Sequence, residues 1–320
     1  MASWRSFPSR GYAVTKNLTV SSLRTEPLTL SLVDEAKVAT LLRLPLERRL
    51  EASGVLARAG QLFVIFDNAS SVGRLSAQLQ NHRGQNSLIP LTGGRGMQYE
   101  DIAYDGATGR FYVLIEALPR DDIFMARVEE YDETFQCLDS RWLNFALDRA
   151  NKGIEGLTCV RRGEHTYLLA LCEGNRCESG AAGRKPGGGR VQIFVAGSRN
   201  WDHVGTIRLP KSVLFEDYSS IAILDDRVAV ISQESSALWV GALHPRLWEF
   251  KNEGAMYLFP RDSERGVLYS GVEGVSWLDT GRVAVVSDRS KDRGSKRSRA
   301  KEQSIHIFDI PDFAADSKEI

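Results

Sequence analysis

Short runs of apolar residues recur along the chain and are separated by turns rich in glycine, aspartate and asparagine. Runs such as 62–66 and 228–231 are rich in β-branched and aromatic residues, which is the composition of β-strands. Apolar positions with a helical period are hard to find within these units. The pattern predicts an all-β protein.

A longer pattern recurs five times along the chain. It consists of an acid, a small residue, a short apolar strand, a turn, a second apolar strand and a second acid. The copies start roughly 50 to 60 residues apart, a period typical of propellers and related arrays. After the second acid, the third copy continues with apolar runs at 190–195 and 203–210, which gives four short strands per repeat, as in a propeller blade. The five copies span 51–67, 99–116, 154–173, 217–234 and 271–288.

The last copy supplies only three strands after its acid, so its fourth strand must come from elsewhere. Residues 37–45 resemble the fourth strand of the third copy and share its Arg-Leu-Pro ending. The sequence therefore predicts a five-bladed β-propeller of four-stranded antiparallel blades, whose last blade is closed by an N-terminal strand at about 37–45. Residues 1–36 would pack on this single domain, 37–320, as an extension. The strand-like stretch 18–32 leaves six blades as an alternative.

Composition narrows the possible partners. The 320 residues include 41 basic and 41 acidic side chains, and a net charge of zero argues against a nucleic-acid-binding surface. No apolar run approaches the ~20 residues that span a bilayer, and the N-terminal segment lacks the apolar core of a secretory signal. The sequence favours a cytoplasmic monomer without membrane association. The cysteines, which have no zinc-site spacing, are interpreted as reduced thiols: Cys137, Cys159, Cys172 and Cys177.

The repeated acids are predicted to gather at one rim of the propeller. In a blade the first strand lines the central channel, and the loop entering it opens on the same face as the loop between strands two and three. The acids at the start of strand one form an inner set of Glu100, Glu155 and Glu273. In the first and fourth copies this inner position holds Ser53 and Ser219 instead. The acids after strand two lie close behind: Asp67, Glu116, Glu173, Glu234 and Asp288.

Crowded carboxylates repel one another, and buried ones are costly unless they are paired, protonated or bound to a metal. A hard cation is one solution, because Ca²⁺ takes about 6–8 oxygen ligands. Arginine pairing across the channel is a second. In a third, each acid caps backbone N–H groups where one blade turns into the next. A cation site and capping can coexist, and repeats copy scaffolding as readily as function.

Two basic insertions follow strand two of the third and fifth copies, at 174–189 and 289–301. By the same topology they overhang the acidic rim, where they could hold a small anionic ligand such as a phosphate ester. They could equally be solvated loops that tolerate charge, and the glycine-rich composition of 174–189 predicts a mobile loop. The candidate anion-binding residues are Arg176, Arg184, Lys185, Arg289, Lys291 and Arg293.

The acid motifs also carry a family resemblance. Glu-Ala-Ser-Gly-Val at 51–55, Ile-Glu-Gly-Leu-Thr at 154–158, Ser-Gln-Glu-Ser-Ser-Ala-Leu at 232–238 and Val-Glu-Gly-Val-Ser at 272–276 resemble the SdiA-regulated (YjiK-like) family of propellers. The resemblance covers roughly 37–310, and the Glu-Gly-Leu type is shared with phytase-like esterase propellers. It implies a five-bladed propeller, allows for a calcium ion and implies no defined activity.

The favoured function is a divalent-cation-binding propeller, with Ca²⁺ at the acidic rim, that serves as a ligand-binding or scaffold protein. A metal-dependent hydrolase of a phosphate ester or lactone is an alternative, with Glu155 or Glu273 binding the metal and Glu173 or Glu116 as general base. A third possibility is an interaction platform for protein or nucleic acid that uses 289–301. No Gly-x-Ser-x-Gly elbow, His-Glu-x-x-His motif or P-loop is present. The histidines do not cluster in sequence, so each is interpreted as a surface or packing residue.

Overall fold

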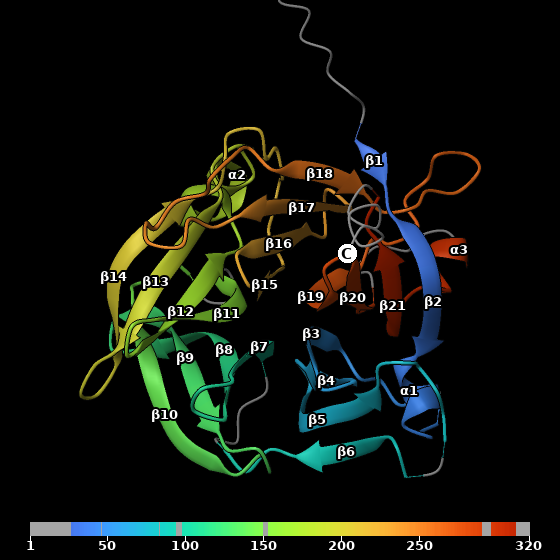
Figure 1. Ribbon diagram of the computed structural model, residues 1–320, viewed down its shortest axis with the longest axis horizontal. Helices are drawn as coiled ribbons and strands as arrows, with labels where there is room; N and C mark the ends of the chain where they lie inside the picture. The colour runs from blue at the N-terminus through green and yellow to red at the C-terminus, as the bar shows by residue number, and fades with distance from the viewer. Residues whose placement is uncertain are drawn as a thin grey trace, which may run out of the picture.

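The computed structural model shows β-sheets arranged around a common centre, with the first strand of each repeat near the middle and the later strands toward the perimeter (Figure 1). The helices within the described residues are single turns, α1 (Val38–Leu41), α2 (Gly180–Gly183), α3 (Lys296–Arg299) and the 3₁₀ turn η1 (Asn175–Cys177). The all-β prediction is confirmed. The structure describes residues 27–45, 47–82, 84–93, 98–149, 153–289 and 296–311.

Two of the four sheets contain the first and last repeats. The first repeat forms a four-stranded sheet of β3 (Ala52–Arg58), β4 (Gln61–Phe66), β5 (Ala69–Ser76) and β6 (Ser87–Pro90). The last repeat forms a sheet of β19 (Val272–Asp279), β20 (Arg282–Ser287), β21 (Ser304–Asp309) and β2 (Ser31–Lys37).

The second and third repeats share one eight-stranded sheet. Their outer strands β10 and β14 meet in a short parallel pairing of Leu143 with Trp201 and Asn144 with Asp202. One half of the sheet consists of β7 (Tyr99–Asp105), β8 (Arg110–Arg120), β9 (Ile123–Tyr131) and β10 (Cys137–Asn144). The other half consists of β11 (Ile154–Arg162), β12 (His165–Cys172), β13 (Arg190–Ala196) and β14 (Trp201–Arg208).

The fourth repeat forms a five-stranded sheet whose last member comes from the N-terminal part of the chain. Leu28–Thr29 (β1) pairs in parallel with the outer strand of the repeat. The repeat itself contributes β15 (Ser220–Leu224), β16 (Arg227–Ser232), β17 (Ala237–Ala242) and β18 (Ala255–Leu258).

An N-terminal strand does complete the last sheet, but it is not the one predicted. Ser31–Lys37 (β2) pairs antiparallel with β21, whereas the predicted strand at 37–45 begins with the helical turn α1. Val38 and Leu41, three residues apart, are both buried on one side of this turn, so their apolar pattern belongs to a helix. β2 lies at the perimeter and is largely exposed, so its sequence lacks the apolar run by which the buried strands were found. Both β1 and β2 thus come from the segment expected to be an extension.

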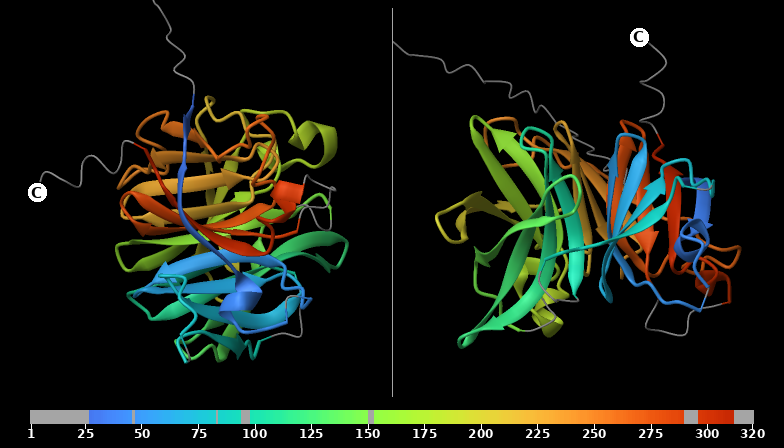
Figure 2. Two further views of the ribbon diagram at one scale, coloured as in Figure 1. Left: turned by 90° about the vertical axis from the view of Figure 1, so that its right-hand side faces the viewer. Right: turned by 90° about the horizontal axis from the view of Figure 1, so that it is seen from below.

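Apolar side chains fill the spaces between neighbouring sheets. Phe63 of β4 packs on Phe111 of β8 with ring centroids 5.3 Å apart, and Val64 shares a core cluster with Val286 of β20. The inner strands β3, β7, β11, β15 and β19 each contact the next along the chain, and β19 contacts β3. Figure 2 shows the same sheets from the side. This packing brings the starts of the inner strands together around the centre.

Candidate acidic site

Four inner strands begin with a β-bulge at the position of the repeated acid. The pairing register shifts between Ala52 and Gly54 in β3, and the equivalent shifts in β7, β11 and β19 enclose Glu100, Glu155 and Glu273. A bulged residue drops out of the ladder, so its side chain can be aimed away from the sheet. The repeated acid therefore marks a local backbone feature that the motif alone did not reveal.

The glycine after the bulge is required by close packing between inner strands. A Cβ on Gly54 would lie 2.7 Å from the Cα of Asp101, and one on Gly274 would lie 2.8 Å from the Cα of Gly54. A Cβ on Gly156 would lie 2.9 Å from the backbone nitrogen of Ile221. These neighbours are backbone atoms that cannot turn aside. The glycine of the Glu-Gly motif is thus scaffolding.

Asp101 performs the capping that was expected of the repeated glutamates. It occupies the position that holds glycine in the first, third and fifth copies and serine in the fourth, and it is 1% exposed. Its Oδ2 accepts hydrogen bonds from the backbone N–H of Leu157 and from the hydroxyl of Ser220, both at 2.9 Å. Burial raises its pKa well above the usual range, and these hydrogen bonds oppose that rise. Asp101 thereby links three inner strands. An acid at a position where the first, third and fifth copies have glycine could have suggested this role.

Glu100 and Glu155 form the centre of the acidic site. Burial is the main cause that raises the pKa of each well above its usual range, and the negative charges of neighbouring glutamates add to it. A hydrogen bond with Glu155 opposes the rise in the pKa of Glu100. The raised pKa values favour protonated carboxyl groups in this pair, which lowers the charge that the pair carries.

The remaining predicted acids surround this pair to different extents. Glu116 and Glu273 raise the pKa of both Glu100 and Glu155 through their charge, Asp67 acts on Glu100, and Glu173 acts on Glu155. Glu273 also accepts a hydrogen bond of 3.1 Å from the side-chain amide of Gln233. Six of the predicted acids therefore lie within one electrostatic cluster: Asp67, Glu100, Glu116, Glu155, Glu173 and Glu273.

Asp288 lies beside this cluster. Burial raises its pKa to about 7, and the charges of Glu51, Asp67 and Glu302 contribute. Its Oδ1 is buried and has no hydrogen-bond partner in the described part of the chain. Asp288 is therefore a carboxyl group that is costly to ionise where it stands.

Glu234 does not join the cluster. Its side chain is exposed, and its backbone N–H donates to Asp217, at 3.1 Å to Oδ1. Asp217 takes its place as the more buried acid of the fourth repeat. Burial raises the pKa of Asp217 to about 6, against hydrogen bonds from Ser232 and Glu234.

The first basic insertion is packed in a way that its composition did not predict. Asn175 is fully buried, and its side-chain amide donates to the carbonyl oxygens of Gly183 and Phe215 at 2.9 and 3.0 Å. Arg176 pairs with Glu178 at 3.3 Å and, like Arg184 and Lys185, is exposed. The predicted mobile loop is therefore a turn organised around a buried asparagine.

The second insertion is only partly described. Arg289 is exposed, and its backbone N–H donates to Asp288. Lys291 and Arg293 lie outside the described residues. The prediction that both insertions bind one anion over the rim stays a prediction.

Two of the cysteines are not reduced thiols, which corrects the sequence-based interpretation. Cys172 and Cys177 form a disulfide with their Cα atoms 5.2 Å apart, because the η1 turn folds the chain back directly after Glu173. Cys137 and Cys159 are free. Cytoplasmic location rested partly on reduced thiols, and it stays a prediction.

The donor set is all oxygen, as a hard cation requires. Within the described ranges, however, no three side chains of histidine, cysteine, aspartate or glutamate are arranged to hold a metal ion. In the same ranges no helix is long and apolar enough to cross a membrane.

Comparison with known proteins supports the fold and leaves the chemistry open. No family model matches the chain, and no curated protein matches it. The structure of Myxococcus xanthus glutaminyl cyclase is similar over 90% of this chain and 100% of that chain, at 12% identity and a TM-score of 0.54. The GH43_1 enzyme from Xanthomonas citri is similar over 87% of this chain and 90% of that chain, at 10% identity and a TM-score of 0.47. The PQQ-bound aldose sugar dehydrogenase from Streptomyces coelicolor is similar over 86% of this chain and 98% of that chain, at 12% identity and a TM-score of 0.44.

At such identities the likeness to the cyclase concerns the fold alone. Together with the sheets arranged around a common centre, it defines the chain as an all-β protein of the β-propeller type.

Proposed function

We propose that this protein is a divalent-cation-binding propeller that takes up Ca²⁺ at the acidic site in exchange for protons. The observation that supports it is the pair of hydrogen-bonded carboxyl groups, Glu100 and Glu155, whose pKa values are raised by burial and by further carboxylates. Such a pair binds a proton at pH values where isolated glutamates are ionised. A divalent cation neutralises the same cluster with two charges, so protons and cation compete.

The residues that would hold the cation are Glu100 and Glu155, with Glu116 and Glu273 as the neighbouring carboxylates. Carboxylate oxygens suit Ca²⁺, which tolerates flexible geometry and water among its ligands. Because no three acids stand ready around one point in the described chain, binding requires protonated carboxyl groups to lose their protons and the side chains to turn. The proposed role is ligand binding or scaffolding around this centre.

Calcium titration by calorimetry tests the proposal. We expect binding to wild-type protein at pH 7.5, weakening of at least tenfold at pH 5.5, and loss of at least tenfold in affinity in Glu155→Gln. Glu164→Gln is the matched control, because this glutamate follows the same strand at its far end and its side chain is 96% exposed. No binding at millimolar Ca²⁺, or equal affinity in Glu155→Gln and Glu164→Gln, would refute the proposal.

We also infer five blades and a place near the SdiA-regulated propellers. In support, the strand pairing that joins the two halves of the eight-stranded sheet within the described residues is the two-residue parallel pairing of β10 and β14, so the sheet can be counted as two blades. The ordered acid motifs support the family resemblance. An experimentally determined structure with a sixth inner strand would contradict the blade count.

A further inference from the structure

A second chemically distinctive cluster lies on the last sheet, outside the acidic site. His306 of β21 has its Nε2 3.0 Å from the Oγ of Ser287 and its Nδ1 3.0 Å from Oε2 of Glu35. The three strands stand side by side in the order β20, β21, β2, and Glu35 is directly opposite His306 in the register. A hydroxyl, an imidazole and a carboxylate are thus aligned by adjacent strands.

The protonation states suit a base that faces the hydroxyl. The hydrogen bond with His306 is the main cause that lowers the pKa of Glu35 to about 2, so this carboxyl group is ionised at neutral pH. An ionised carboxylate can only accept, so Nδ1 of His306 carries the proton. Burial lowers the pKa of His306, which favours the neutral ring, and the hydrogen bonds with Glu35 and with the carbonyl oxygen of Lys301 oppose that fall. In the neutral ring with Nδ1 protonated, Nε2 can accept a hydrogen bond from Ser287.

The imidazole is held in place by its surroundings as well as by Glu35. Tyr269 meets the ring edge-on with centroids 5.0 Å apart, and Phe308 lies 6.1 Å away. Lys301 is a second charged group that acts on the ring. Its ammonium pairs with Oε1 of Glu35, and its carbonyl oxygen lies 3.1 Å from Nε2. The carboxylate therefore orients the base and also fastens the turn that carries Lys301.

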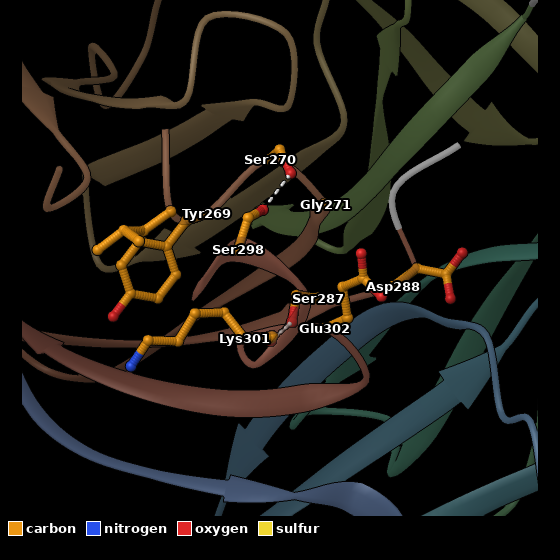
Figure 3. A pocket seen from close by; sticks show the side chains of 9 residues that line it. Tyr269, Ser270, Gly271, Ser287, Asp288, Ser298, Lys301 and Glu302 are labelled. Carbon is orange, nitrogen blue, oxygen red and sulfur yellow. Dashed lines mark hydrogen bonds between the residues drawn. The ribbon is translucent and has the colours of Figure 1, made fainter. Parts of the chain in front are cut away.

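Ser287 opens toward a small hollow. The hollow is lined by Ser287, Asp288, Ser270, Gly271 and Lys301 among others, and at rest it has no room for a water-sized molecule (Figure 3). At rest the hydroxyl of Ser287 donates to the carbonyl oxygen of Lys301 at 2.6 Å. Rotation about the Cβ–Oγ bond redirects it to Nε2, because both acceptors are within reach. Ser287 is 2% exposed and His306 is fully buried, so access requires the turn at 301–302 to move aside.

We propose that Ser287, His306 and Glu35 form a nucleophilic acyl-transfer site for a small ester. A nucleophile within hydrogen-bond reach of a base, which is in turn oriented by a third group, is the arrangement that activates a serine hydroxyl. Ser287 is the nucleophile, His306 is the general base, and Glu35 is the positioning residue. This site is independent of the proposed cation function.

The ester and water are the two reactants of the reaction. The Oγ of Ser287 bonds to the ester carbonyl carbon while its proton passes to Nε2 of His306. The bond from that carbon to the alkoxy oxygen then breaks, and the leaving alcohol takes the proton from Nε2. Water attacks the acyl-serine, again through Nε2, and releases the carboxylic acid and free Ser287.

A small serine-directed probe, diisopropyl fluorophosphate, tests the proposal on the full chain in the presence of a chelator. We expect an adduct on Ser287, located by peptide mass spectrometry, and at least about 100-fold slower labelling in His306→Gln, the range for loss of a general base. Ser270→Ala is the matched control: this serine lines the same hollow, bonded at 3.0 Å to Ser298, and its loss should leave labelling unchanged.

Glu35→Gln separates positioning from a merely structural role. Without the carboxylate the pKa of His306 falls further, so the labelling rate should drop and the midpoint of its pH profile should move to lower pH. An unmoved midpoint would overturn the role of Glu35. Absence of any adduct on Ser287 in folded wild-type protein, or equal rates in wild type and His306→Gln, would overturn the site itself. Should His306→Gln fail to melt cooperatively, the wild-type adduct map alone decides.

Discussion

The raised pKa of Asp288 makes a quantitative prediction about how stability depends on pH. Burial moves this pKa from 3.8 to about 7. The folded protein therefore binds this proton more tightly than the unfolded chain, and stability falls as pH rises from about 4 to above 7. Asparagine at position 288 cannot ionise, so the Asp288→Asn variant should not lose this stability as pH rises.

The magnitude follows from the same values. Each tenfold change in proton affinity is worth about 1.4 kcal/mol, so a rise in pKa from 3.8 to about 7 corresponds to about 4 kcal/mol at pH 8. Partial exposure screens the charge, so we expect about 2 to 4 kcal/mol. The asparagine oxygen can keep the hydrogen bond from the backbone N–H of Arg289. The amide nitrogen then occupies the place of the buried unpartnered Oδ1, close to the charges of Glu51, Asp67 and Glu302.

The assay is urea unfolding of wild type and Asp288→Asn between pH 4 and 8, in a chelator so that no cation contributes. We expect nearly equal free energies of unfolding at pH 4 and a variant that is about 2 to 4 kcal/mol more stable at pH 8. Asp122→Asn, an exposed aspartate in the turn after β8, controls for the loss of one negative charge. A difference for Asp288→Asn that stays flat with pH, or a variant less stable than wild type at pH 8, would refute the reasoning.

Three further predictions concern the scaffold of the site. Gly54→Ala should destabilise the fold by about 1–3 kcal/mol in urea unfolding, because the new Cβ would lie 2.7 Å from the backbone of Asp101. Gly106→Ala is the control: its new Cβ would have its nearest neighbour at 3.7 Å, so it should cost less than about 1 kcal/mol. Asp101→Ala should cost about 3–5 kcal/mol by leaving the N–H of Leu157 and the hydroxyl of Ser220 without their acceptor, and a loss below 1 kcal/mol would contradict the linking role. Thiol titration of the denatured, unreduced protein should count two thiols, Cys137 and Cys159, and a count of four would exclude the disulfide. Reduction of the Cys172–Cys177 bond should lower the free energy of unfolding by about 2 kcal/mol, because the bond closes a short loop.

The strands were predictable where burial imposes an apolar pattern on them. The inner and middle strands, such as β4 and β16, are buried on both faces and appear as apolar runs. β2 could not be found in the same way, because at the perimeter of the last sheet it buries little and its sequence reads as polar. The closing strand was predicted at 37–45 because Val38 and Leu41 are apolar. These side chains are buried from the helical turn α1, and the strand lies just before it at β2.

The acidic site was predictable as a gathering of residues, and its chemistry was not. Repeated acids at equivalent positions must converge when the repeats are arranged around a centre, and six of them do. Which of the carboxyl groups have raised pKa values depends on burial and bulge geometry, which a motif does not encode. The Cys172–Cys177 bond was missed because its short span closes only through the η1 turn. Ser287, His306 and Glu35 meet across three strands from distant parts of the chain, so no sequence spacing could connect them.

Proton release on calcium binding tests the central claim most directly. Ca²⁺ is added to chelator-free protein in weak buffer at pH 6.5, and the pH change is recorded alongside bound calcium measured by elemental mass spectrometry. The account predicts about one Ca²⁺ per chain together with a measurable release of protons, both lost in Glu100→Gln and Glu155→Gln and retained in Glu164→Gln. Retention of no calcium, or calcium bound without proton release, would contradict the exchange of protons for a cation at Glu100 and Glu155.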